Sequence, residues 1–117
     1  MNIPRADEKS KEFFRSILPD DPGITIRPMF GNISAFVNGN MFAGLFGNDL
    51  FVRVSEENRK ELLDKKGASL LEPMKGRPMK EYVVIPKTWR NQPETVQVWV
   101  IRSLDWTSRL PPKKTKK

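Results

Sequence analysis

The side chains best suited to chemistry are the basic residues in the last part of the chain, and that chemistry is phosphate binding. Through residue 72 the sequence has 10 Lys/Arg and 11 Asp/Glu, whereas from residue 73 it has 11 Lys/Arg and 3 Asp/Glu. Such a segment attracts anions over about one Debye length, roughly 8 Å at physiological salt. The candidate nucleic-acid contacts are Lys75, Arg77, Lys80, Lys87, Arg90, Lys113, Lys114, Lys116 and Lys117.

Trp89 lies between two of these cations, where an exposed indole would stack on a base. The alternative is a solvated loop and tail, with Trp89 packed beside the end of a strand.

Groups for enzymatic chemistry are scarce in this sequence. It contains no Cys and no His, which excludes disulfides, thiolate nucleophiles, Ser-His-Asp triads and Cys/His zinc sites. The remaining candidates are three arginines for anion binding and three groups for proton transfer, namely Arg27, Arg53, Arg77, Lys80, Glu81 and Tyr82. No glycine spacing matches a phosphate loop or a dinucleotide fingerprint, and no nucleophile is paired with a base. We therefore predict a non-enzymatic protein with no catalytic, cofactor or metal site.

A second candidate site is the aromatic face of a predicted β-meander. Three apolar runs, 33–37, 41–46 and 50–54, are separated by Asn38-Gly39 and Gly47-Asn48, pairs typical of two-residue hairpin turns. Two-residue turns put one set of residues on a single face: Ile33, Ala35, Val37, Phe42, Phe46, Phe51 and Arg53. The opposite set is Ser34, Phe36, Met41, Ala43, Leu45, Leu50, Val52 and Val54. A register shift of one residue would exchange the sets.

Both of these faces are apolar, so we expect the first and last helices to cover them. If the face with Phe42, Phe46 and Phe51 is uncovered, it is a candidate interface, for example in a homodimer.

The remaining elements surround this meander. Helices are predicted over residues 7–18, 56–66 and 93–104, with strands over 24–27, 68–72 and 81–85 and a basic loop over 75–80. The run 98–101 would also suit a buried strand. The fold class is therefore α+β: an antiparallel β-meander sheet flanked by N-terminal, middle and C-terminal helices. We expect one domain, residues 1–110, and a disordered basic tail, residues 111–117.

Cellular location follows from two observations on the sequence. No apolar stretch approaches the roughly 20 residues that span a membrane, and the N-terminus lacks the apolar segment of a secretory signal. We expect a cytoplasmic protein.

Several strings in this order resemble the TfoX N-terminal domain of the TfoX/Sxy family. They are Arg27-x-Met29-Phe30-Gly31, Asn38-Gly39, Met41-Phe42-Ala43, Leu50-Phe51-Val52-Arg53-Val54, Gly67, Lys75-Gly76-Arg77-Pro78-Met79, Tyr82-x-x-x-Pro86, Trp99 and Leu104. The resemblance covers about residues 10–105 and identifies a single-domain member. It implies an α+β fold similar to bacterial secretion chaperones, and it supplies no catalytic residues.

The best-known members of that family regulate natural competence and are thought to work with a cyclic-AMP-dependent transcription activator. The resemblance thus implies a small regulatory domain that binds nucleic acid or a DNA-bound transcription regulator. The alternative is a chaperone-like dimeric adaptor that binds a protein or peptide through its sheet edge or apolar face.

Overall fold

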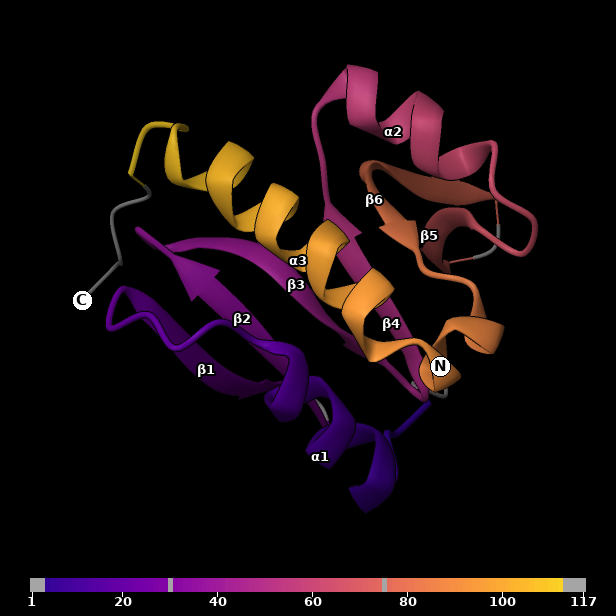
Figure 1. Cartoon of the computed structure of the whole chain (residues 1–117), viewed down its shortest axis with the longest axis horizontal. Helices are drawn as coiled ribbons and strands as arrows, with labels where there is room; N and C mark the ends of the chain where they lie inside the picture. Colours follow the sequence, from indigo (N-terminus) through magenta and orange to yellow (C-terminus); the bar gives the residue numbers. More distant parts are fainter. Residues whose placement is uncertain (1–3, 30, 75, 113–117) are drawn as a thin grey trace.

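Six antiparallel strands and three α-helices form the structure, a computed structural model that describes residues 4–29, 31–74 and 76–112 (Figure 1). The strand order is β1-β2-β3-β4-β6-β5, so β1 and β5 are the edges of an open sheet. The elements are α1 (Glu8–Ile17), β1 (Ile24–Met29), β2 (Asn32–Val37), β3 (Asn40–Phe46), β4 (Asp49–Arg53), α2 (Glu56–Leu63), β5 (Ser69–Met74), β6 (Arg77–Val84), the 3₁₀ helix η1 (Lys87–Asn91) and α3 (Pro93–Ser108). The predicted α+β fold is confirmed.

Local sequence explains where the helices begin. Asp7 caps α1 by accepting a 2.7 Å hydrogen bond from the backbone N–H of Ser10. Ser55 caps α2 in the same way through Asn58. Pro93 occupies the first position of α3, where its missing N–H costs no intrahelical bond. The run 98–101 is therefore helical, as the proline start predicts.

The meander is confirmed, but its register differs from the prediction on one side. Asn38 and Gly39 have φ values of 52° and 79°, as a two-residue turn of the predicted kind requires. The β2–β3 pairing then shifts between Phe36↔Met41 and Ala35↔Ala43, which makes Phe42 the extra residue of a bulge.

This bulge changes the composition of both faces. The core cluster joins residues that were expected on opposite faces, including Ile33, Ala35, Val37, Phe42, Ala43, Leu45, Leu50, Val52 and Val54. The other face includes Ser34, Gly44 and Phe51. The predicted faces were wrong for the β2 residues, for Met41 and for Phe42, because a bulge reverses the alternation beyond it.

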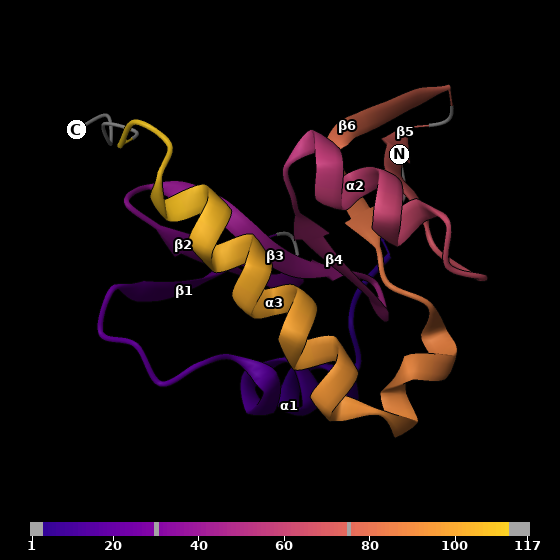
Figure 2. The same cartoon turned by 45° about the horizontal axis from the view of Figure 1, so that its top comes forward.

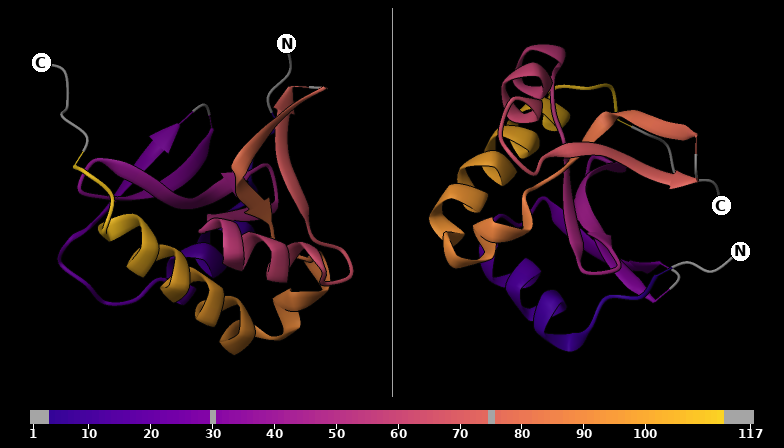
Figure 3. Two further views of the ribbon diagram at one scale, coloured as in Figure 1. Left: turned by 90° about the horizontal axis from the view of Figure 1, so that it is seen from above. Right: turned by 90° about the vertical axis from the view of Figure 1, so that its right-hand side faces the viewer.

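All three helices lie on one face of the sheet (Figure 3). Phe14 of α1, Leu62 of α2 and Val100 of α3 are completely buried in a single cluster with the strands. In Figure 2, α3 crosses the strands of the meander and α2 lies beside β5 and β6. The expectation that the first and last helices cover opposite faces was therefore wrong.

The predicted basic loop belongs instead to a long hairpin. β6 begins at Arg77, so residues 77–80 are strand, and their pairing with β5 shifts twice. The hairpin extends away from the helices in Figure 3. No helix within the described ranges is long and apolar enough to cross a membrane.

Candidate functional site

A hollow of about 700 Å³ lies between the α2–β5 connection, the start of β4, the end of β6 and η1. Its charged and polar lining consists of Lys65, Lys66, Lys87, Asp49, Ser69, Thr88 and Trp89. Figure 1 shows the α2–β5 connection and η1 at the same end of the β5–β6 pair. We call this feature the lysine hollow.

A close contact between Gly67 and Pro86 brings the two parts of the lysine hollow together. Gly67 has φ +93°, a conformation that favours glycine after a helix. A Cβ at Gly67 would lie 3.2 Å from Cβ of Pro86, so the two backbones are closely packed. Pro86 also starts η1 by accepting a 3.0 Å hydrogen bond from the N–H of Trp89. Lys65 and Lys66, which precede Gly67, thus line the same hollow as Lys87, which follows Pro86.

The electrostatics of the lysine hollow favour anions. Its lining contains three lysines and one carboxylate, that of Asp49. Lys87 Nζ lies 3.4 Å from Asp49 Oδ1, and the lysine side chain remains 79% exposed. That oxygen is buried and has no hydrogen-bond partner among the described residues. Because Lys65 and Lys66 are exposed, the lining has a net positive charge that is accessible to a ligand.

Arg90, next to the lysine hollow, connects three elements. Its Nη2 donates hydrogen bonds to Ser10 Oγ at 2.6 Å and to the Asn48 carbonyl at 2.8 Å. Its guanidinium carbon lies 5.7 Å from the ring centroid of Phe13. Arg90 therefore joins η1 to α1 and to the β3–β4 turn.

Asp7 lies near the same contact. The backbone N–H of Ser10, and then its hydroxyl, lower the pKa of Asp7 below its ordinary value, and the charges of Arg90 and Lys9 act in the same direction. Desolvation opposes this shift.

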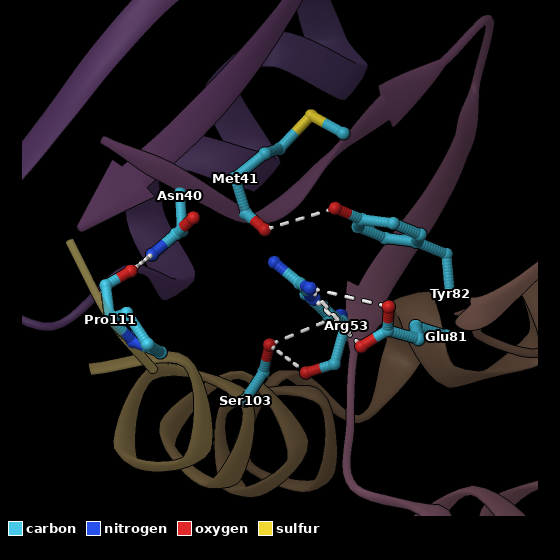
Figure 4. A network of polar contacts seen from close by, with 7 residues as sticks. All are labelled: Asn40, Met41, Arg53, Glu81, Tyr82, Ser103 and Pro111. Carbon is cyan, nitrogen blue, oxygen red and sulfur yellow. Dashed lines mark hydrogen bonds and ion pairs between the residues drawn. The ribbon is translucent and has the colours of Figure 1, made fainter. Parts of the chain in front are cut away.

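A polar network lies at the end of β4, beside the C-terminal half of α3 (Figure 4). Arg53 makes a two-nitrogen contact with the carboxylate of Glu81, with a shortest distance of 3.1 Å. Its guanidinium lies 5.7 Å from the ring centroid of Tyr82, whose hydroxyl donates to the Met41 carbonyl at 3.3 Å. Burial raises the pKa of Tyr82. The fold thus assembles Arg53, Glu81 and Tyr82, in an arrangement where the arginine charge is already neutralised.

The order and type of these elements agree with the family that the sequence resembles. A sequence model of the TfoX N-terminal domain matches residues 16–106 of the 117-residue chain. The chain belongs to the TfoX N-terminal domain family. That membership makes it a small regulatory-type domain. No curated protein matches the chain in sequence.

In this TfoX N-terminal domain the predicted basic residues are divided among several places. Arg77 and Lys80 are exposed on β6, toward the tip of the hairpin. Lys87 and Trp89 line the lysine hollow, and Trp89 also packs against the core. Arg90 makes the contacts to α1 described above. Lys75, Lys113, Lys114, Lys116 and Lys117 lie outside the described residues.

The predicted tail begins with an attached segment. The Pro111 carbonyl accepts a 3.0 Å hydrogen bond from Asn40, beside the β2–β3 turn. The rest of the tail, residues 113–117, falls outside the described part of the chain.

The aromatic residues of the TfoX N-terminal domain do not form one surface. Phe42 is completely buried beneath α3, whereas Phe51 is 4% exposed on the helix-free face. The Phe51 ring meets Tyr82 edge-on, with centroids 5.6 Å apart. Phe46 is half-buried and lies two residues after Gly44, the partner of Phe51, so it is on the face of Phe51 and not of Phe42. The proposed interface of Phe42, Phe46 and Phe51 is thus not assembled as one patch.

Sequence reasoning missed Lys65 and Lys66 as site residues. Cations interact favourably with the dipole at the C-terminal end of a helix. This role accounted for both lysines without any contact to a ligand. The sequence contains Lys65-Lys66-Gly67 and, about 20 residues later, Pro86-Lys87. Nothing in the sequence indicates that these two segments meet; only the packing of Gly67 on Pro86 brings them together. Across the described residues, no group of three or more carboxylates, His or Cys is placed to hold a metal ion.

Proposed function

We propose that this TfoX N-terminal domain is a non-enzymatic regulatory module of the cytoplasm that binds nucleic acid through the lysine hollow. The observation that supports the proposal is the convergence of Lys65, Lys66 and Lys87 on one hollow. Each lysine that contacts a phosphate releases counterions, so the contacts add binding free energy that depends on salt. Regulation of transcription, including that of competence, would act through such binding or through a DNA-bound partner.

Two further features support nucleic acid as the ligand. The chain has a formal net charge of +7 at pH 7, which favours encounter with polyanions. Arg77 and Lys80 add exposed cations on the hairpin, which starts at the rim of the lysine hollow with Ser69. Arg77 and Lys80 would extend the contact along the sugar-phosphate backbone of the nucleic acid. The lysine hollow would contribute most of the binding free energy.

The test compares two triple variants that remove the same charge. Lys65→Ala/Lys66→Ala/Lys87→Ala removes the hollow cations, and Arg15→Ala/Arg27→Ala/Arg109→Ala removes three exposed cations elsewhere. Fluorescence anisotropy with labelled DNA and RNA is measured at several salt concentrations. The hollow variant should bind more weakly and lose up to about 2 units of log–log salt slope on single strands, at about 0.7 per phosphate.

Equal weakening by the two variants would contradict the proposal, because it would mean that binding depends on net charge alone. Circular dichroism and thermal unfolding of both variants verify that each remains folded.

The second candidate is a dimeric adaptor for a protein or peptide, and one observation favours it. The sheet is open, and its edge strands, β1 and β5, offer backbone groups to which an extended segment can add. Recovery of a protein partner after nuclease treatment of a lysate, together with no retardation of DNA or RNA, would favour this function. A dimer mass by light scattering would support the homodimer.

A further inference from the structure

The lysine hollow is concave, and its shape restricts which phosphate it can enclose. A volume of about 700 Å³ is within the range of small-ligand sites, roughly 300–1,000 Å³. The internal phosphates of a duplex lie along a convex surface and contact a protein from outside. A phosphate at the end of a strand, or on a small molecule, can instead enter between the α2–β5 connection and η1.

The charges of the lysine hollow also suit a terminal phosphate. A phosphate monoester carries about −1.5 to −2 charges near pH 7, whereas an internal diester carries one. Lysine ammonium groups act as point charges with three donors each, and they can approach one group from several directions. Ser69 and Thr88 add hydroxyl donors to the lining. Three lysines opposed by one aspartate leave two charges for such a dianion.

We infer that the lysine hollow holds a terminal phosphate, a monoester at the end of a nucleic acid strand or on a free small molecule. The inference rests on the proposed function and names the part of the ligand that the hollow recognises. Lys65 and Lys66 contact the phosphate from one wall, and Lys87 contacts it from the opposite wall. Ribose 5-phosphate and a 5′-phosphorylated strand share this chemistry.

Asp49 opposes binding of the phosphate. Its carboxylate pairs with Lys87 at 3.4 Å, so the incoming phosphate competes with it for that lysine and is repelled by its charge. Asp49→Asn keeps the shape of the side chain and removes the charge. The substitution should therefore increase affinity for a phosphate monoester, whereas an unrelated loss of stability would decrease it.

The experiment uses two arms that separate the sources of phosphate. The first arm measures anisotropy of a 3′-labelled single-stranded oligonucleotide that carries either a 5′-phosphate or a 5′-hydroxyl. The second arm titrates ribose 5-phosphate, with ribose as control, and records tryptophan fluorescence of the intact chain and of Trp89→Phe. Of the three tryptophans, Trp89 lines the hollow, Trp99 is buried in the core, and Trp106 lies near the C-terminal end of α3 and does not line the hollow. The signal should therefore depend on Trp89.

We expect the 5′-phosphate to bind at least fivefold more tightly than the 5′-hydroxyl, and this preference to disappear in Lys65→Ala/Lys66→Ala/Lys87→Ala. Asp49→Asn should increase the preference, and Arg15→Ala/Arg27→Ala/Arg109→Ala should retain it. A preference for the 5′-phosphate in the first arm would identify the end of a nucleic acid strand as the ligand of the lysine hollow. Saturable quenching in the second arm, without a preference in the first, would identify a small molecule as the ligand.

Equal affinities in the first arm, together with no saturable response to ribose 5-phosphate, would overturn the inference. If the hollow variant still loses nucleic-acid affinity in that case, the proposed function stands without it. If instead the hollow variant and the control variant bind nucleic acid equally well, both the inference and the proposed function are wrong.

Discussion

The hydroxyl of Ser103, on α3, accepts a 3.1 Å hydrogen bond from the backbone N–H of Arg53, on β4 (Figure 4). The same oxygen lies within hydrogen-bond distance of the carbonyl oxygens of Phe42 and Arg53. The β3–β4 pairing ends at Ala43↔Val52, so these backbone groups lie just beyond the ladder. A side chain of α3 thus provides a hydrogen-bond partner for backbone groups of β3 and β4 at the point where the two strands separate.

Ser103→Ala should destabilise the domain by about 1–3 kcal/mol, because it leaves buried backbone donors and acceptors without a partner. The measurement is urea unfolding at equilibrium. Ser108→Ala is the control, since Ser108 is exposed and its hydroxyl contacts only a carbonyl of its own helix in the described structure. Equal midpoints for the two variants would show that the Ser103 bridge contributes nothing.

Gly44→Ala should destabilise the domain through overpacking. A Cβ at this position would lie 2.6 Å from Ser34 Oγ and 2.7 Å from Cζ of Phe51, closer than packed atoms allow. Overpacking of this kind typically costs about 1–3 kcal/mol. Thermal unfolding checks the value. Gly23→Ala is the control, because the only atom close to the added Cβ is Oδ1 of the exposed Asp21 side chain, at 3.2 Å.

A double variant separates this explanation from a backbone effect. Phe51→Leu shortens the ring that meets the new methyl group, so Gly44→Ala should cost less in that background. If the cost is unchanged, the ring of Phe51 is not the cause.

Alkaline pH should weaken the fold through Tyr82. Burial raises the pKa of its hydroxyl in the folded state, whereas in the unfolded chain it ionises near about pH 10. Above that pH the unfolded chain has lost a proton that the folded chain retains, so the free energy of unfolding falls as pH rises. Below that pH the contribution is complete. The difference in stability between the intact chain and Tyr82→Phe, measured from about pH 8 to pH 11, should decrease with pH.

Arg90→Lys should lower stability by about 1–2 kcal/mol and leave nucleic-acid affinity close to that of the intact chain. Lysine cannot reproduce the paired contacts to Ser10 and Asn48 together with the position over Phe13. Urea unfolding measures the first effect, and anisotropy at a temperature where both proteins are folded measures the second. A tenfold loss of affinity with unchanged stability would assign Arg90 to the ligand instead.

The order of the elements was predictable from local chemistry. Asn38-Gly39 forms the predicted two-residue turn, and Asp7, Ser55 and Pro93 each start a helix within one residue of its predicted start. The face assignment failed at Phe42 because a bulge depends on how two strands pack, which the periodicity of one strand does not report.

The candidate site was predictable only in part. Lys87 and Trp89 were expected to contact a ligand because the basic part of the chain places an indole between cations. Lys65 and Lys66 reach the same hollow only through the packing of Gly67 on Pro86. Arg90 shows the opposite limit: it belongs to the basic part of the chain, but its partners, Ser10 and Asn48, lie 80 and 42 residues away. A charge pattern indicates where cations occur along a chain and not what each one contacts.

The position of α3 has a consequence for synthesis of the protein. This helix covers β2, β3 and β4 and yet follows every strand in the chain. While a ribosome is still translating residues 93–108, the strands that α3 covers have left the exit tunnel with that apolar surface still accessible to water and to chaperones. Stable folding should therefore complete only after the last helix has emerged from the tunnel.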